Sequence, residues 1–127
     1  MKKIISTTDA PSAIGPYSQA AEAGGFIFIS GQLPIDPATG AFAGNDIAAQ
    51  TAAVIKNLEA ILKSRGLSLE NIVKTTVFMT DLAQFARMNE VYGSFFSKNP
   101  PARAAVEVKA LPKAALVEIE AVAVNAL

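Results

Sequence analysis

The alternation of apolar and polar residues along the chain predicts six strands. Near the N-terminus, short apolar runs are separated by Gly and Pro, and Gly24-Gly25 between two such runs is typical of a hairpin turn. Further along, β-branched residues recur in runs bounded by polar or turn-forming residues. The predicted strands are 3–7, 17–23, 26–30, 72–80, 103–109 and 116–124.

Two other stretches carry apolar residues at helical spacing. The first follows Asn45 or Asp46 as N-cap and ends at Gly66, a residue type that stops helices in the left-handed conformation. The second follows Asp81, and Gln84 three residues later makes a capping-box-like start. Its apolar stripe consists of Leu82, Phe85, Met88, Tyr92, Phe95 and Phe96.

The order of these elements predicts an α+β fold with a single mixed β-sheet. Three strands are followed by a helix, a strand, a second helix and two strands, so both helices are expected on one face of the sheet. The last two strands carry apolar residues on both faces, and we therefore expect the uncovered face to be buried against another copy of the chain. The length favours a single domain over residues 1–127.

The composition narrows the possible chemistry and partners. The chain has 11 basic and 11 acidic residues, and no cluster of Lys or Arg, so we expect no nucleic-acid partner. It has no Cys and no His, which removes the thiolate nucleophile, the usual metal ligands and the usual general base. We expect no metal and no cofactor. The start, Met1-Lys2-Lys3, is followed by only two apolar residues, which predicts no membrane association and a cytoplasmic location.

Arg103 and the carboxylates of the last predicted strand are the candidate chemistry. If the last two strands form an antiparallel hairpin, Arg103 shares a face with Glu118 and Glu120. Ala105 and Glu107 then share this face, with Ala105 opposite Glu118 and Arg103 opposite Glu120. The guanidinium can bind a ligand carboxylate through two parallel hydrogen bonds. It can equally form a cross-strand ion pair with Glu120 or extend into water.

Several segments resemble the RidA/YjgF/YER057c/UK114 family of imine deaminases. The matches follow the family's order along the whole chain: AIGPYSQA (13–20), FISGQLPIDPATG (28–40), IVKTTVFMTDL (72–82), MNEVYGSFF (88–96), PARAAVEV (101–108) and VEIEA (117–121). The resemblance implies a chorismate-mutase-like fold and a homotrimer whose active sites lie between subunits. It also implies hydrolysis of reactive imines and enamines such as 2-aminoacrylate to 2-keto acids and ammonia, the activity of a 2-iminobutanoate/2-iminopropanoate deaminase.

The resemblance implies roles for individual residues. Arg103 would bind the substrate carboxylate, and Glu118 would orient and deprotonate the attacking water. The other residues expected to line the cleft are Tyr17, Ser30, Gly31, Asn89 and Ala105. Many family members carry Cys where this chain has Ala105, so a thiol contact to the catalytic water is absent here.

Other interpretations of these residues and of the function stay open. Tyr17 can be an aromatic residue at a strand end, Ser30 and Gly31 a turn, and Asn89 a polar residue on the outside of the second helix. The alternative function is a non-catalytic protein that binds small carboxylates and regulates a partner. An endoribonuclease is a further alternative, although a neutral chain without His offers few groups for phosphodiester cleavage.

Overall fold

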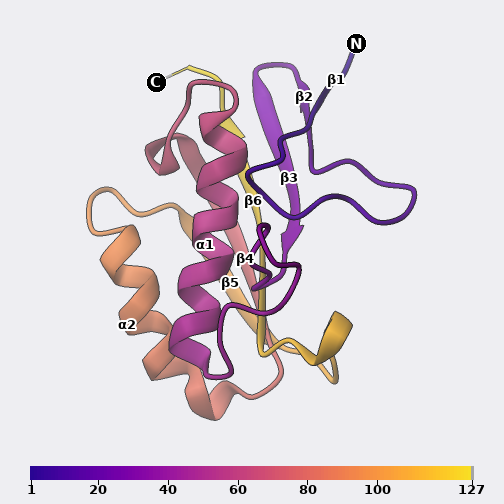
Figure 1. Cartoon of the computed structure of the whole chain (residues 1–127). Coiled ribbons are helices and arrows are strands. Elements are labelled where there is room, and N and C mark those ends of the chain that lie inside the picture. Colours follow the sequence, from indigo (N-terminus) through magenta and orange to yellow (C-terminus); the bar gives the residue numbers. More distant parts are fainter. Residues whose placement is uncertain (127) are drawn as a thin grey trace.

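The computed structural model describes residues 1–126 as one six-stranded mixed sheet with two α-helices (Figure 1). The strands are β1 (Lys3–Ile5), β2 (Ala20–Ala23), β3 (Phe26–Gln32), β4 (Ile72–Met79), β5 (Ala102–Glu107) and β6 (Val117–Val124). The helices are α1 (Ile47–Lys63), α2 (Phe85–Phe95) and the short 3-10 helices η1 (Leu69–Asn71), η2 (Leu82–Gln84) and η3 (Pro112–Ala114). The predicted α+β fold and element order are confirmed. Residue 127, the end of the predicted domain, lies outside the described residues.

Local sequence signals determine the hairpin and the first helix. Gly24 and Gly25 both have positive φ, 60° and 81°, which allows the tight turn between β2 and β3. Asp46 caps α1 as predicted, since its side chain accepts a hydrogen bond of 2.8 Å from the backbone N–H of Ala49. Gly66 has a φ of 72° and lies in the turn that follows α1.

The second helix begins later than the sequence predicts. Asp81 caps η2 rather than an α-helix, and Gln84 makes no side-chain capping bond, so α2 starts at Phe85. A residue from another strand contributes to this start, because Glu107 of β5 accepts a hydrogen bond of 2.8 Å from the N–H of Leu82. The tighter first turn therefore depends on a partner that is distant in sequence.

The strand order contradicts the predicted hairpin of the last two strands. The sheet runs β1-β2-β3-β6-β4-β5, so β4 lies between β5 and β6. β5 pairs with β4 in parallel, while β6 pairs antiparallel with both β3 and β4. The helix α2 is long enough to connect two parallel strands, which leaves β5 at an edge and β6 in the centre.

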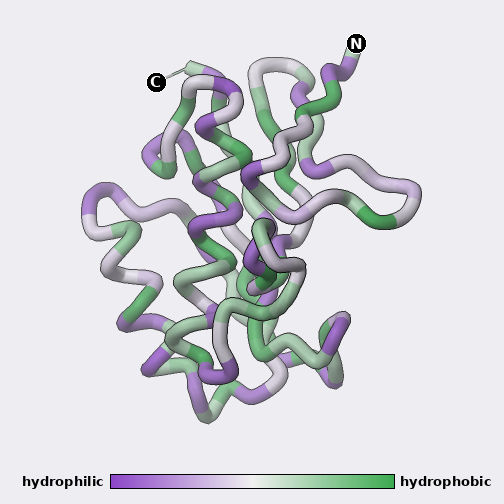
Figure 2. Tube along the Cα trace, viewed as in Figure 1, coloured by the Kyte–Doolittle hydropathy of each residue, from purple (hydrophilic) through white to green (hydrophobic). Residues whose placement is uncertain are grey.

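The two faces of the sheet differ in their surroundings. On the covered face, α1 and α2 bury apolar residues of the central strands, including Val77, Val117 and Ile119. Hydrophobic positions recur along the central strands and α1 (Figure 2). On the other, open face, Phe26 and Phe28 are 45% and 51% exposed. The last two strands carry apolar residues on both faces, as predicted, since Val117 and Ile119 are buried on the covered face and Val106 is 42% exposed on the open face. None of the helices within residues 1–126 is long and apolar enough to cross a membrane.

Candidate active site

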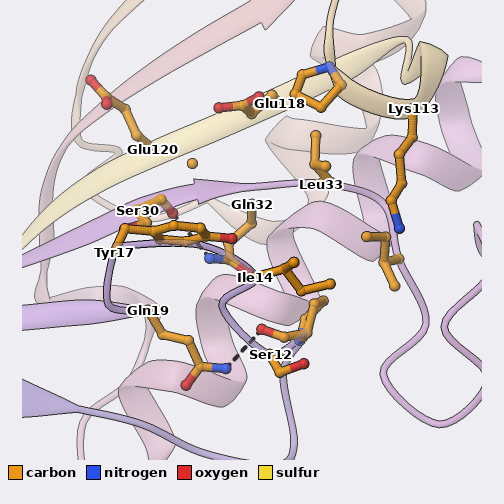
Figure 3. A pocket seen from close by; sticks show the side chains of 14 residues that line it. Ser12, Ile14, Tyr17, Gln19, Ser30, Gln32, Leu33, Lys113, Glu118 and Glu120 are labelled. Atoms are coloured by element: carbon orange, nitrogen blue, oxygen red, sulfur yellow. Dashed lines mark hydrogen bonds between the residues drawn. The ribbon is translucent and has the colours of Figure 1, made fainter.

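A cleft of about 630 Å³ lies between the loop before β2, the end of β3, η3 and β6. Figure 3 shows Glu118 and Glu120 along β6, Tyr17 beside Ser30, and Lys113 on another side of the cleft. The cleft therefore combines two carboxylates, an ammonium group, a phenol and a hydroxyl. Within residues 1–126, no group of three His, Cys, Asp or Glu side chains is placed to hold a metal ion.

An irregularity in β3 shapes one wall of the cleft. Ile29 pairs with Ala121 and Gln32 with Ile119, so two residues of β3, Ser30 and Gly31, lie opposite a single residue of β6. Such a bulge bends the strand and redirects its side chains. The Ser30 hydroxyl donates a hydrogen bond of 2.6 Å to the carbonyl of Ser18 and so ties the bulge to the loop before β2.

The loop before β2, which carries Tyr17, is anchored by the buried side chain of Gln19. Its amide group donates hydrogen bonds to the carbonyls of Thr7 (3.0 Å), Ala10 (3.3 Å) and Pro11 (2.8 Å). The Gln19 carbonyl oxygen accepts a further bond of 2.7 Å from the N–H of Thr7. Gln19 was not among the predicted site residues, although it lies in the segment AIGPYSQA. Its role depends on partners up to 12 residues away, which no local pattern reveals.

The carboxylate of Glu118 lies against the backbone of Gly31. A Cβ atom at position 31 would lie 2.8 Å from Cδ of Glu118 and closer still to Oε2, so only glycine leaves room for this carboxylate. Burial raises the pKa of Glu118, and the negative charge of Glu120 raises it further. Glu118 accepts no hydrogen bond from the described residues, so its oxygens are available to a water molecule. This arrangement suits a proton acceptor.

Arg103, Asn89 and Ala105 form a second group on the covered face of the sheet. Arg103 donates a hydrogen bond of 2.7 Å from Nη1 to the side-chain oxygen of Asn89. Its guanidinium carbon lies 4.7 Å from the ring centre of Tyr92 and 5.4 Å from that of Phe85. Ala105 is half-buried against the core. Arg103 makes no ion pair with any residue between 1 and 126, so its charge is available to a ligand.

The register of the central strands separates Arg103 from the carboxylates of β6. Thr75 of β4 pairs with Arg103 on one side, whereas Phe78 pairs with Glu118 on the other. Paired residues share a face and successive residues alternate, so Arg103 and Glu118 point to opposite faces.

The cross-strand pairings that follow from the hairpin prediction are therefore wrong. Glu118 does not lie opposite Ala105, and Arg103 forms no ion pair with Glu120. Arg103, Ala105 and Glu107 do not share a face with Glu118 and Glu120, and Glu107 instead caps η2. The physical reason is that β4 lies between β5 and β6, so the register of each strand with β4 decides which face its side chains point to.

The predicted site residues therefore form two groups at different places in the chain's fold. Tyr17, Ser30, Gly31 and Glu118 line the cleft together. Asn89 and Arg103 meet elsewhere, next to Tyr92, and Ala105 shares their face of the sheet. The open alternatives for single residues are also resolved in part. Tyr17 precedes β2 rather than ending a strand, and Ser30 and Gly31 belong to a bulge in β3.

The chain is similar to known proteins over nearly its whole length. The family model described as Endoribonuclease L-PSP matches residues 7–125. A RutC family protein from Pyrococcus horikoshii is 54% identical over 123 residues, which cover 97% of this chain and 98% of the relative. The human 2-iminobutanoate/2-iminopropanoate deaminase is 46% identical over 125 residues, covering 98% and 91%. A crystal structure of E. coli TdcF with bound serine superimposes with a TM-score of 0.93 at 46% identity and covers 98% and 99%.

Proposed function

Because the chain belongs to the RidA/YjgF/YER057c/UK114 family, whose model is described as Endoribonuclease L-PSP, we propose that it hydrolyses reactive 2-imino acids and their enamines to 2-keto acids and ammonia. The observation that carries the proposal is the half-buried Glu118, whose pKa is raised and whose carboxylate lies against Gly31 at the wall of the cleft. The human relative named as an imine deaminase supports the reaction class. The serine bound to E. coli TdcF supports a small amino-acid-like ligand.

The proposed reaction needs one proton acceptor and one anion-binding group. An enamine such as 2-aminoacrylate first takes a proton from solvent at its methylene carbon and becomes the iminium. Glu118 accepts a proton from water as the water oxygen bonds to the iminium carbon, and the C=N electron pair moves to nitrogen. The proton then passes from Glu118 to the amine, and the C–N bond breaks with release of ammonia. The ammonia takes up the proton of the hydroxyl as this group becomes the keto group. The products are a 2-keto acid and ammonium.

Arg103 is proposed to bind the substrate carboxylate from a neighbouring copy of the chain. Its guanidinium has no carboxylate partner within residues 1–126, and it lies on the opposite face of the sheet from Glu118. A site that needs both groups is therefore incomplete in one chain. The exposed Phe26 and Phe28 on the open face supply apolar surface for association. We propose a homotrimer in which each cleft receives Arg103 and Asn89 from the next subunit.

A mixing experiment tests the shared site. Subunits carrying Arg103→Lys and subunits carrying Glu118→Gln are each expected to be nearly inactive. In randomly mixed cyclic trimers, half of the sites receive a normal Arg103 and half of those also hold a normal Glu118, so about a quarter of the sites are complete. Co-refolding the two variants at equal amounts should thus restore about a quarter of the wild-type rate. No recovery in a mixture that sediments as trimers would place both residues of a site in one subunit.

The function itself is tested with 2-aminoacrylate generated in situ by a serine or threonine dehydratase. Added protein is expected to accelerate pyruvate release in proportion to its concentration, and heat-denatured protein is the control. A protein that only senses carboxylates would bind pyruvate saturably and leave the release rate unchanged. Cleavage of RNA by the same preparation, abolished by Glu118→Gln, would favour the endoribonuclease alternative. The cleft disfavours it, because Glu118 and Glu120 repel a phosphate backbone.

Removing the charge of Glu120 is expected to shift the pH profile to lower pH. Glu120 helps to raise the pKa of Glu118, so Glu120→Gln lowers that pKa. The base stays ionised at lower pH, and the acid limb of the kcat/KM profile should move accordingly. The matched control is Glu59→Gln on α1, where the carboxylate contacts only Lys63 at the surface. An acid limb that moves equally in both variants, or in neither, would contradict the assignment of Glu118 as the titrating base.

A further inference from the structure

We infer that Tyr92, held in place by Thr75, is a positioning residue that makes Arg103 specific for carboxylates. The inference rests on the proposed role of Arg103 as the anion-binding group. It adds a residue that does not touch the substrate, since Tyr92 is only 4% exposed and lies beneath the guanidinium. The Tyr92 ring is held in a fixed position, and the side chains that contact Arg103 are uncharged. One edge of the Arg103 guanidinium makes no hydrogen bond to the described residues.

A buried hydrogen bond to Thr75 fixes the position of the Tyr92 ring. Its hydroxyl and the Thr75 hydroxyl share a buried hydrogen bond of 2.7 Å, and Thr75 is fully buried. Thr75 is also the direct partner of Arg103 in the parallel pairing of β4 with β5. Thr75 therefore contacts both parts of this arrangement. It pairs with the backbone that carries Arg103, and it bonds to the ring that supports the Arg103 side chain. The ring cannot move without breaking a buried hydrogen bond.

All the groups that support Arg103 are neutral. The Tyr92 and Phe85 rings attract the guanidinium through their faces, and Asn89 accepts one hydrogen bond through an amide oxygen. Burial raises the pKa of Tyr92, so the ring stays a neutral phenol. A carboxylate in any of these places would neutralise the guanidinium and occupy its donors. Neutral support holds the side chain still and leaves its positive charge for a ligand.

The hydrogen bond to Asn89 also decides which N–H donors of Arg103 remain available to a ligand. Nη1 is engaged with Asn89, whereas Nε and Nη2 make no hydrogen bond to the described residues. These two nitrogens form one edge of the guanidinium, with two parallel N–H groups that match the two oxygens of a carboxylate. Holding this edge in a fixed plane should favour a carboxylate over a neutral carboxamide, since a carboxamide offers only one acceptor oxygen. Fixation also reduces the loss of side-chain freedom when a ligand binds.

Binding measurements on the assembled protein test the inference without depending on turnover. The two probes are 2-oxobutanoate and its neutral amide, 2-oxobutanamide, with affinities measured by calorimetry. The wild type should bind the acid more tightly than the amide. Tyr92→Leu should reduce this preference by about tenfold, because the ring face is lost. Tyr92→Phe and Thr75→Val keep the ring but remove the hydroxyl bond, and each should reduce the preference by a smaller factor.

A matched control separates positioning from general packing. Phe95→Leu removes a half-buried ring from the same helix without contacting Arg103, so it should lower the melting temperature and leave the acid-to-amide preference unchanged. Equal loss of both ligands in Tyr92→Leu would mean a purely structural role. If Tyr92→Leu does not fold, an unchanged preference in both Tyr92→Phe and Thr75→Val overturns the inference. So does a wild type that binds acid and amide equally. A wild type that prefers the acid but does not hydrolyse imines would contradict the proposed function alone.

Discussion

Glu118→Gln is expected to lower kcat for imine hydrolysis by roughly 10²- to 10⁴-fold, the usual contribution of a general base. Glutamine has nearly the same shape and fits against Gly31, but its amide cannot take a proton from water. Affinity for the product 2-keto acid should stay close to that of the wild type, because Arg103 is unchanged. The measurement is pyruvate release from 2-aminoacrylate, combined with calorimetric binding of pyruvate. Hydrolysis at the wild-type rate would show that the water is activated elsewhere.

Glu118→Gln is also expected to keep or raise the stability of the fold at neutral pH, so its loss of activity would not be caused by unfolding. The raised pKa of Glu118 means that the folded chain holds this proton more tightly than the unfolded chain. Stability therefore falls as the pH rises from the ordinary pKa of Glu through the raised value, and the ionised group is unfavourable above it. Glu118→Gln should be at least as stable as the wild type at neutral pH. Thermal unfolding at neutral pH measures this, with Glu59→Gln as the surface control.

Arg103→Lys is expected to lower kcat/KM by about 10²-fold although the charge is kept, in the range found when one partner of a hydrogen-bonded charge pair is lost. A lysine ammonium is a point charge and cannot bind Asn89 on one side while it presents two parallel donors on the other. The loss should appear mainly in substrate affinity, and 2-oxobutanoate should bind correspondingly more weakly. Steady-state kinetics and calorimetry measure the two effects.

A second arginine of the same region provides the control for this substitution. Arg87 lies on α2 and pairs only with Glu90 at the surface, so Arg87→Lys should leave both kinetics and binding unchanged. Equal turnover of Arg103→Lys and wild type would mean that Arg103 serves the fold rather than the ligand. A fall in melting temperature of Arg103→Lys that matches its loss of activity would lead to the same conclusion.

Local sequence patterns were enough to predict the elements and their order. Gly24 and Gly25 can adopt positive φ without strain, as a tight hairpin turn requires, and Asp46 supplies a capping oxygen wherever a helix begins after it. Such signals act over a few residues and need no knowledge of the rest of the chain. The start of α2 was predicted less well, because Glu107 of β5 holds the N–H of Leu82 in η2.

The neighbours of each strand were not determined locally. The segments that became β5 and β6 follow each other with a short connection, which is why a hairpin was the simplest prediction. In the structure β6 pairs with both β3 and β4 and buries Val117, Ile119 and Ala121, whereas β5 stays at the edge. This choice depends on the total apolar area buried by the whole sheet, and no single segment encodes it.

By itself, the sequence determined which residue types were available for chemistry: a chain without His or Cys has to rely on groups such as Arg103, Glu118 and Tyr17. Tertiary structure decided which of them meet. The registers of β5 and β6 with β4 placed Arg103 and Glu118 on opposite faces of the sheet. The bulge in β3 brought Gly31 against the Glu118 carboxylate. The physical reason is that a strand alternates with a period of two, so one intervening strand with its own register changes which side chains share a face.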